Sequence, residues 1–360
     1  MSVPGIPAID QRLVDEYDTA HERMASSVRA ADPAAQLVFT VVQRRLMVES
    51  LAYVQSVLVR PVGQLAVPPP RTFLTRAQQL RVRGATAAFR HIDTRITLEQ
   101  QGLVATAVDP STPQALHALF EGANPGDHET NPGMLRATST SWQKDINPFT
   151  HPPAAECPAL LAEAMDIMED RSVAGAVRAG WFMFTFLTIH PFVDGNGRTS
   201  RGLYLTVASP SLSLGLDWGI VEQWSVSRSE YIATLQAGNH VTQYDTKVMT
   251  AEPFTRYSIA ASIAGVDVCT QRLMMLGRAY GEHRDAGLST DAAIVATVIA
   301  ADRCCTWEEL LPTGLSAARL DAAVAELLDR GAVGWAPRPH GRRTIDDPAE
   351  YALFPATVAG

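Results

Sequence analysis

Apolar residues recur at helical spacing along most of the chain, and this pattern constrains the fold more than any other feature. In residues 34–59 they return every three or four positions, which gathers them on one face of an α-helix. The pattern predicts further helices over residues 72–104, 112–122, 157–171, 173–189 and 251–284, with another beginning near Gly197. We therefore expect an all-α fold.

Two helix starts carry signals of their own. Thr112 and Pro113 place a proline in the first turn, where its missing N–H costs nothing, and Gly122 should end this helix. Ser227 to Glu230 spells Ser-Arg-Ser-Glu, which predicts a capping box in front of a helix that includes Tyr231.

Composition limits the classes of function. Apolar residues make up 46% of the 360-residue chain and charged residues 19%, so it can bury a substantial core and is not globally disordered. The net charge of −8, from 30 basic and 38 acidic residues, argues against nucleic acid as the main partner. The four cysteines show no C-x-x-C pair and no metal spacing, so we expect them to be buried in a reducing cytosol.

The sequence also bears on location. The N-terminal residues lack the basic stretch and the long apolar stretch of a targeting segment. The most apolar segment, residues 180–189, is too short to span a bilayer and reads as a core helix. We expect a cytoplasmic protein without a membrane partner.

Breaks in the helical pattern suggest how the chain is organised. Residues 62–70 contain three successive prolines and a glycine and read as a linker. Residues 123–156 are rich in Pro, Asn, Gly, Thr and Ser, which predicts a long loop with a short hairpin around 135–143. A loop of this length inside a compact domain usually has a function.

The composition changes after residue 285. Three short helices are expected, over residues 290–301, in residues 306–311 and over residues 316–329. A small hairpin from residues 331–335 and 342–345 should follow them. Short helices followed by a hairpin are the outline of a winged helix. We therefore predict three parts, which are an N-terminal helical region (1–105), a catalytic core (106–284) and a winged-helix-like C-terminal domain (285–360).

One segment, residues 190–201, carries a pattern that points to phosphate chemistry. Its Gly-Asn-Gly turn, formed by Gly195, Asn196 and Gly197, lies where an apolar helix ends and the next begins. Glycines let successive backbone N–H groups converge, and a helix start adds its positive dipole end, so the turn can form an anion nest. Arg198 and Arg201 share one face of the new helix and can hold further phosphate oxygens.

Two more residues of the segment complete the chemistry. Asp194 stands at the lip of the turn, where a carboxylate can hold Mg²⁺ against phosphates. His190 is the group nearby that can take a proton near neutral pH. The pattern therefore suits attack by a hydroxyl on a nucleotide phosphate, with His190 as general base.

The segment resembles the signature of Fic proteins, H-x-F-x-[D/E]-G-N-G-R-x-x-R, and every fixed position is present. The likeness extends to residues 116–122, 131–136, 152–153 and 160–161, and covers the chain from about 110 to 280. It implies the mainly helical Fic fold with a small β-hairpin flap. It also implies a protein adenylyltransferase, which transfers AMP from ATP to a Ser, Thr or Tyr hydroxyl of a target protein and releases pyrophosphate.

The resemblance implies a role for each motif position. His190 would deprotonate the target hydroxyl, Phe192 would anchor the loop in the core, and Asp194 would bind Mg²⁺ that bridges the α- and β-phosphates. The nest would be Gly195, Asn196 and Gly197 with Asn196 at the α-phosphate, and the β- and γ-phosphates would be held by Arg198 and Arg201.

Two assignments outside the motif also come from the resemblance. Residues 231–239 look like the family's nucleoside-binding helix, which would place Tyr231 at the nucleotide and Asn239 at the adenine. Tyr231 can equally be a core residue, and Asn239 a helix cap or turn residue. The segment near 137–146 would be the flap, where the target protein binds by adding a strand.

The chain departs from the family in one regulatory respect. Many Fic proteins inhibit themselves with a helix motif, [S/T]-x-x-x-E-[G/N], whose glutamate pairs with the second motif arginine, here Arg201. Residues 50–65 fall in the expected place but hold no matching glutamate, and Glu49 is followed by Ser50. Gln101 stands at the matching spacing after Thr97 but bears no charge. The enzyme is then unrestrained, inhibited by a separate partner, or inhibited by an unrecognised helix.

Other functions remain open at this point. The same fold could use another nucleotide or phosphate donor, or remove AMP from a modified protein. The C-terminal part could instead bind DNA, because residues 288–346 contain several arginines, which are Arg319, Arg330, Arg338, Arg342 and Arg343. Acidic residues in the same region weaken phosphate contact, so packing or homodimer formation is the simpler role for it.

Overall fold

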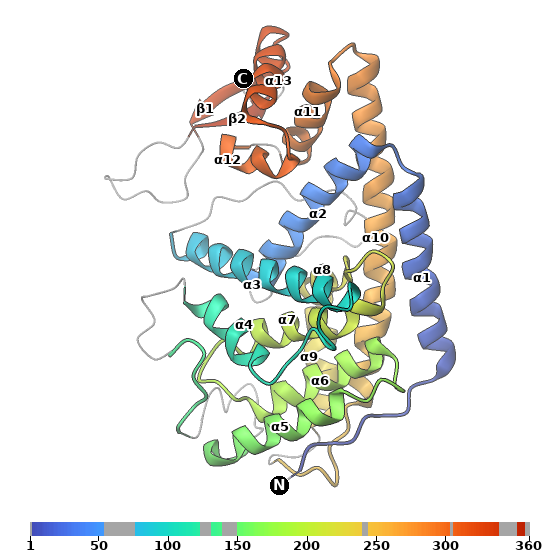
Figure 1. The fold of residues 1–360 in the computed structure, drawn as a ribbon, viewed down its shortest axis with the longest axis vertical. Helices are drawn as coiled ribbons and strands as arrows, with labels where there is room; N and C mark the ends of the chain where they lie inside the picture. Colours follow the sequence, from blue (N-terminus) through green and yellow to red (C-terminus); the bar gives the residue numbers. More distant parts are fainter. Residues whose placement is uncertain are drawn as a thin grey trace. The chain divides into compact units, whose positions relative to one another are not determined.

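A computed structural model describes residues 2–53, 76–122, 131–138, 150–239, 244–302, 305–337 and 351–356 (Figure 1). Three predicted features lie outside these ranges. They are the linker at 62–70, the flap from residue 139 onward and the strand at 342–345.

Helices dominate the described part of the chain. In the N-terminal half they are α1 (Gln11–Ala30), α2 (Pro33–Tyr53), α3 (Arg76–Gln100), α4 (Thr112–Glu121), α5 (Cys157–Met168) and α6 (Gly175–Ile189). In the C-terminal half they are α7 (Asn196–Ala208), α8 (Ile220–Val226), α9 (Arg228–Gly238), α10 (Glu252–Asp285), α11 (Thr290–Asp302), α12 (Trp307–Leu310) and α13 (Ala317–Asp329). One described sheet pairs β1 (Val333–Pro337) with β2 (Tyr351–Pro355), so the mainly helical fold is confirmed.

The chain divides into two compact units. Unit 1 comprises residues Met1–Arg23, Val48–Val57 and Gln79–Val266, and unit 2 comprises Met24–Met47, Leu58–Gln78 and Asp267–Gly360. Each unit therefore takes residues from both the N-terminal helices and the rest of the chain. The predicted boundaries near residues 105 and 284 stay predictions.

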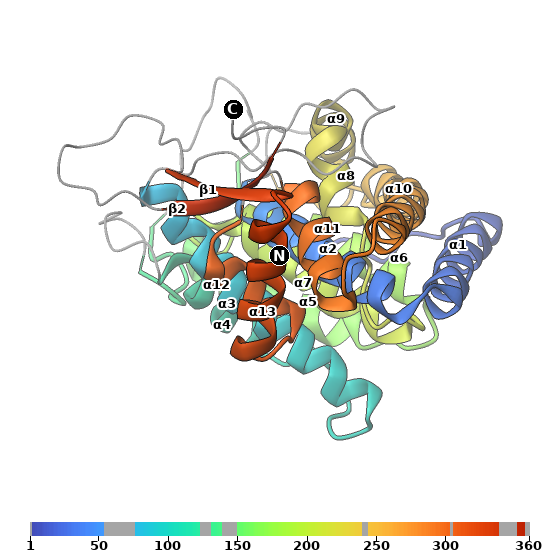
Figure 2. The same cartoon turned by 90° about the horizontal axis from the view of Figure 1, so that it is seen from above.

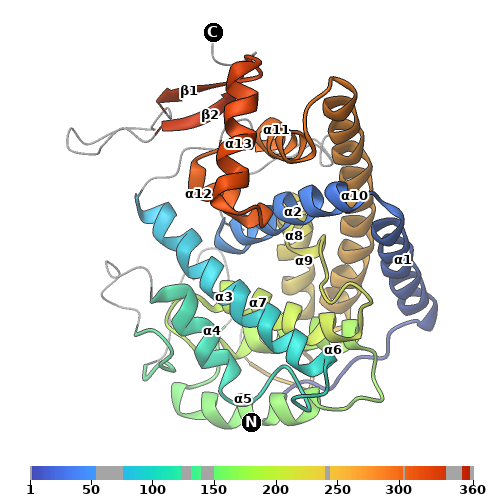
Figure 3. The same cartoon turned by 45° about the horizontal axis from the view of Figure 1, so that its top comes forward.

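The core of unit 1 is built around α6. Its apolar residues are buried on every side of the helix, as expected from its near-continuous apolar run between Gly180 and Ile189. α6 packs against α5 and α7, and α7 packs against α4 (Figure 3). A Cβ at Gly180 would lie 3.0 Å from the Cα of Thr255, so a glycine is needed where α10 passes α6. This packing holds both helices that flank residues 190–195.

Two predicted helix ends have different outcomes. α4 has its proline in the first turn and Gly122 at its C-terminal cap, as predicted. The capping box at Ser227 is wrong, because the Ser227 hydroxyl donates to the Gln223 carbonyl (2.7 Å) and bonds to the Tyr257 hydroxyl (2.7 Å). Only one residue separates α8 from α9, so Ser227 serves the end of the first helix.

In unit 2, α11, α12 and α13 are followed by the antiparallel pair β1 and β2 (Figure 2). Val333 pairs with Pro355, so the described partner of β1 comes from residues 351–355, while the predicted strand at 342–345 lies outside the described residues. A real capping box, between Thr306 and Glu309, starts α12. The order of three helices and a hairpin is the one predicted, and its assignment as a winged helix stays a prediction.

Two further expectations concern burial. Cys157, Cys269 and Cys305 are free and buried, as predicted, while Cys304 lies outside the described residues. α10 is the described helix long and apolar enough to cross a membrane, but 50% of its most apolar window is buried within the protein. Core helices meet the same criteria, so one such helix is weak evidence for a membrane span.

Candidate active site

The motif loop connects the end of α6 to the start of α7. The predicted helix end at His190 is confirmed, and α7 begins at Asn196, one residue before the predicted start. His190 closes α6 in the left-handed conformation (φ 52°, ψ 59°), which is uncommon for a residue with a side chain. Its backbone N–H still donates to the Phe186 carbonyl, at 2.9 Å. Such strain at a helix end marks a candidate functional residue.

Asn196 holds the loop closed. Its side-chain oxygen accepts the Phe192 N–H (3.0 Å), and its side-chain nitrogen donates to the Phe192 carbonyl (2.9 Å). Both polar atoms of the amide are therefore bonded to the loop backbone. What Asn196 offers a phosphate is its backbone N–H, since the first N–H groups of a helix have no partner within it.

Phe192 anchors the loop, as the resemblance implies. Its side chain is fully buried and stacks on the His117 ring from α4, with ring centres 3.8 Å apart. His117 Nδ1 accepts the Gly133 N–H (2.8 Å), so its Nε2 carries the proton and donates to the Asp194 carbonyl (3.0 Å). Burial lowers the pKa of His117 to about 4, which keeps this neutral form in place near pH 7.

The turn at Gly195 requires glycine for two reasons. Its φ of 77° lies in the left-handed region, and a Cβ there would come within 2.5 Å of Glu121 Oε1. Glu121, from α4, is 2% exposed, and its Oε1 lies 3.0 Å from Nη2 of Arg198. A buried carboxylate thus lies directly behind the turn and fixes the first motif arginine.

Asp194 and Arg198 form the outer side of the loop. Nη2 of Arg198 also donates to Asp194 Oδ2, at 3.2 Å. The Asp194 side chain is 52% exposed and that of Arg198 only 13%. The aspartate is therefore the carboxylate that solvent and ligands can reach, at the position predicted for a metal ligand.

Arg201 is buried beside the start of α7. Its Nη2 donates to the Leu51 carbonyl (3.4 Å), and it hydrogen-bonds to Tyr231. Its Nε has no partner among the described residues. Burial lowers the pKa of Arg201 to about 10, so the side chain is still charged at neutral pH. A charged, buried guanidinium with a free N–H favours an anion nearby.

The surroundings of His190 come from segments far away in the sequence. The His151 ring stacks on the His190 ring, with centres 4.2 Å apart and an interplanar angle of 22°. Arg136, 3% exposed, donates through Nε to the His190 carbonyl at 2.8 Å. Burial, followed by the charges of His151 and Arg136, lowers the pKa of His190 to about 3.

Arg136 binds four backbone carbonyls in all. Besides His190 they belong to Thr138 (3.1 Å), Ile189 (3.4 Å) and Pro152. One guanidinium thereby joins the end of α6 to two neighbouring loops. Sequence reasoning quoted residues 131–136 as part of a resemblance but gave Arg136 no role, because nothing local in the sequence shows which carbonyls meet there.

The comparisons with known proteins agree with this arrangement. Residues 108–208, which include the motif loop and all of α4 to α7, match the family model described as Fic/DOC family. The matched residues therefore resemble a Fic/DOC domain. No curated protein matches the chain in sequence.

Three solved structures are similar to this chain at low identity. A Fic family protein from Desulfovibrio desulfuricans G20 has a TM-score of 0.50 and 16% identity, over 98% of both chains. Fic-1 from C. elegans (residues 134–508) has a TM-score of 0.48 and 20% identity, over 77% of this chain and 73% of that one. A Fic domain containing signaling protein from Bacteroides thetaiotaomicron VPI-5482 has a TM-score of 0.49 and 13% identity, over 72% of this chain and 98% of that one. The first of these likenesses shows the fold alone.

Tyr231 lies on α9, and Asn239 follows the last residue of this helix. Tyr231 is buried, with its ring centre 5.3 Å from that of Phe254, and bonds to Arg201. It therefore lies in the core and also contacts the motif. Asn239 is the C-terminal cap residue of α9, and no hydrogen bond joins it to residues 190–201 among the described residues. Its contact with adenine stays a prediction.

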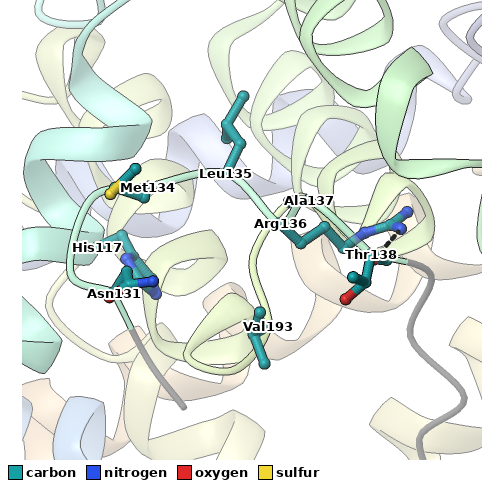
Figure 4. Close-up of a pocket in the computed structure, with 8 residues that line it drawn as sticks. All are labelled: His117, Asn131, Met134, Leu135, Arg136, Ala137, Thr138 and Val193. Atoms are coloured by element: carbon teal, nitrogen blue, oxygen red, sulfur yellow. Dashed lines mark hydrogen bonds between the residues drawn. The ribbon is translucent and has the colours of Figure 1, made fainter. Parts of the chain in front are cut away.

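A pocket of about 230 Å³ lies between the motif loop and residues 131–138 (Figure 4). Val193 borders it from the loop, and Met134 and Leu135 border it from the facing segment. Four polar residues also line it, and two of them, His117 and Arg136, already have hydrogen-bond partners. The other two are Asn131 and Thr138. The pocket therefore offers both apolar and polar contact beside the loop, next to the described start of the predicted flap.

Proposed function

We propose that the chain is a protein adenylyltransferase, which transfers AMP from ATP to a Ser, Thr or Tyr hydroxyl of a target protein. Members of the Fic family are commonly AMP transferases or other nucleotide transferases. The observation that carries the proposal is Arg201, which is 4% exposed, charged, and has an unpartnered Nε beside the start of α7. A buried cation with a free N–H at a helix N-terminus suits a phosphate group.

The phosphates of ATP would lie along the start of α7. The first backbone N–H groups of this helix and its positive dipole end attract negative charge. Arg198 and Arg201 would add charge-assisted hydrogen bonds to the outer phosphates. Glu121 keeps Arg198 at this position, so the arginine needs little reorganisation when the nucleotide binds.

The residues fit a magnesium ion held mainly by the nucleotide. Asp194 is an exposed carboxylate, which is the ligand type that Mg²⁺ prefers. The described residues contain no group of three or more His, Cys, Asp or Glu that could hold a metal ion alone. Phosphate oxygens and water would therefore supply most of the ligands. When bound, the ion would neutralise charge on the phosphates during transfer.

His190 would act on the target hydroxyl. Its low pKa keeps the ring neutral, and a neutral imidazole can accept a proton. Negative phosphates beside the ring would favour its protonated form and raise its pKa toward the working pH. A base is most effective when its pKa is near that pH, so nucleotide binding itself would prepare His190.

The reaction then balances as follows. The hydroxyl oxygen of the target forms a bond to the α-phosphorus of ATP while His190 takes the hydroxyl proton. The bond from the α-phosphorus to the bridging oxygen breaks, and the electron pair leaves with pyrophosphate. Arg198 and Arg201 stabilise the charge on the leaving group. The products are AMP-modified protein, pyrophosphate and a proton.

The test uses ATP labelled at the α- or the γ-phosphate, with full-length protein and Mg²⁺. The proposal expects label on protein from the α-position only, and transfer of this label about a hundredfold slower or more with the His190→Ala variant. Label from the γ-position only would show phosphotransfer and overturn AMP transfer. Label from neither position, with a panel of candidate targets present, would also contradict the proposal.

A second candidate keeps the site and changes the nucleotide. The nest, Arg198 and Arg201 recognise phosphates, and no described contact joins Asn239 to them. The base of the donor is therefore the least constrained part of the substrate. Parallel reactions with α-labelled CTP, GTP and UTP distinguish this candidate, because preference for one of them over ATP would replace adenylyl transfer by another nucleotidyl transfer.

DNA binding by the C-terminal part has less support. Arg319 makes two bonds to Asp291 (2.8 and 2.6 Å), and Arg330 lies 3.6 Å from Glu326 and also donates to the Gly287 carbonyl. These two arginines are engaged inside unit 2, and the other three of the set lie outside the described residues. A packing or homodimer role for residues 285–360 stays the preferred proposal.

A further inference from the structure

A second imidazole is built into the site beside His190. The His151 ring lies 4.2 Å from the His190 ring between centres, at an interplanar angle of 22°, which is a stacked arrangement. The two residues are 39 positions apart in the sequence, and His151 is not part of the motif that identifies the family. Such a contact between two titratable rings is either incidental packing or a contact that orients His190, the proposed base.

The His151 ring is held in a fixed orientation. Its Nδ1 lies 3.0 Å from the Thr188 carbonyl in the last turn of α6. A carbonyl oxygen only accepts hydrogen bonds, so Nδ1 carries the proton and donates. Thr188 is buried, and its own hydroxyl donates to the Thr185 carbonyl at 2.8 Å. The last turn of α6 thus fixes His151 through Thr188, which lies two residues before His190 in the sequence.

His190 leaves helical geometry at the end of α6, in the left-handed conformation. Arg136 fixes its backbone carbonyl, and the ring itself keeps one hydrogen bond to the preceding turn, at the Leu187 carbonyl. That bond anchors one edge of the ring, and stacking on His151 covers one of its faces. The two contacts together restrain the plane of the ring.

The charges around the two rings are of one kind. The charged groups that act on His190 are His151 and Arg136, and Arg136 also acts on His151. Each of these charges opposes protonation of the ring that it faces. The hydrogen bonds that the rings make to the Leu187 and Thr188 carbonyls act in the opposite direction. Burial is the larger cause, and together with these charges it keeps both imidazoles neutral until a bound anion offsets the guanidinium.

We propose that His151 is a positioning residue for His190, whose ring it holds by stacking in the plane in which it can take the hydroxyl proton. The inference rests on the proposed function, since it concerns the base of that reaction. His151 does not exchange the proton itself. Its flat ring, already bonded to Thr188, restricts the His190 ring and excludes water from one face of it.

Two substitutions of His151 distinguish the effect of its flat ring from that of its nitrogen atoms. His151→Phe keeps a flat ring of similar size, whereas His151→Ala removes the ring. His283→Ala, on the part of α10 that belongs to unit 2, is the matched control for the loss of a histidine. The single-turnover rate of self-modification with α-labelled ATP is measured against ATP concentration, together with thermal stability.

The rate has a definite expected pattern. His151→Ala should slow the step by about tenfold or more, because misplaced reacting groups cost roughly that much. The ATP concentration for half-maximal rate should stay unchanged, because His151 does not hold the nucleotide. His151→Phe should recover most of the rate. Equal rates for His151→Ala and His283→Ala would overturn the proposal, as would a Phe variant that is folded and as slow as the Ala variant.

A second measurement does not depend on activity. NMR titration of histidine-labelled protein follows the His190 ring, whose signals are identified by their loss in His190→Ala. Removal of the His151 ring lets water reach His190, so its pKa should rise toward the ordinary value, while His151→Phe should keep it low. An unchanged His190 titration in His151→Ala would overturn the proposal. If the wild type transfers no AMP but this shift is found, the proposed reaction fails and the positioning role stands.

Discussion

The Leu51 carbonyl, near the end of α2, accepts a hydrogen bond from Nη2 of Arg201 at 3.4 Å. Both residues belong to unit 1. Carbonyls at the end of a helix carry partial negative charge, so α2 presents its negative end to the second motif arginine. The sequence led us to look for a glutamate at this place. The described chain offers a backbone oxygen there instead, and no described carboxylate is bonded to Arg201.

The hydrogen bond between Arg201 and the Leu51 carbonyl predicts only weak self-inhibition of the proposed transfer. A neutral carbonyl makes a hydrogen bond roughly half as strong as a charge-assisted one, so ATP phosphates should displace it from Arg201. We expect the unmodified full-length protein to label itself with α-labelled ATP. Glu49→Gly should change the rate little, because Glu49 does not contact Arg201. A silent wild type that Glu49→Gly activates strongly would contradict this prediction.

His190→Ala should reduce transfer by about a hundredfold or more, the usual contribution of a general base. The affinity for ATP should stay near that of the wild type, because the His190 ring does not hold the nucleotide. Equilibrium binding of ATP and the rate of label transfer measure the two effects separately. Near-normal transfer by the alanine variant would show that another group takes the proton.

Asp194→Ala should lose Mg²⁺-dependent transfer, because the motif loop contains no other carboxylate. Asp170→Ala is a matched control, since Asp170 is also an exposed carboxylate that accepts bonds from a nearby residue, Ser172. The transfer rate is measured over a series of Mg²⁺ concentrations. If more Mg²⁺ restores the full rate to the Asp194 variant, Asp194 is not a principal ligand.

The sequence predicted the parts of the site that depend on local chemistry. The turn between α6 and α7 and its flanking helix ends were found within one residue, because Gly195 and the apolar run before His190 act locally. Arg136, His151 and Glu121 received no site role because they reach the loop only through tertiary packing. Ser227 was misjudged for the same reason, since the Tyr257 hydroxyl that it meets comes from α10.

Gly195→Ala should destabilise the protein more than an ordinary glycine substitution. It adds a Cβ within 2.5 Å of the buried Glu121 carboxylate, in addition to the strain of a positive φ. Gly102→Ala is the control, because Gly102 has a similar φ of 69° and nothing within 4 Å of the added Cβ. We expect a loss of about 1 kcal/mol in the control and about 2–4 kcal/mol in Gly195→Ala, read from urea unfolding. Equal losses of unfolding free energy in the two variants would show that the Glu121 side chain moves aside without a measurable cost in stability.

The last prediction concerns His21 of α1, which is buried in unit 1 and faces α10. Its Nε2 lies 3.0 Å from the Ser262 hydroxyl and 3.8 Å from Asp217 Oδ1. Burial lowers the pKa of His21 below its ordinary 6.5, against the opposing effects of Asp217 and Asp18. The unfolded chain therefore takes up the proton at a higher pH than the folded one.

A lowered folded-state pKa fixes the sign of the pH effect. The free energy of unfolding should fall as the pH drops below 6.5 and stop falling below the folded pKa of His21. His21→Gln removes the titration, so its stability should depend less on pH in this range. Ser262→Ala removes the hydroxyl partner but keeps the imidazole, so it should be less stable while retaining the pH slope. Urea unfolding of the three proteins between about pH 5 and 7.5 measures these slopes. If His21→Gln keeps the wild-type slope, His21 does not contribute to the loss of stability in acid.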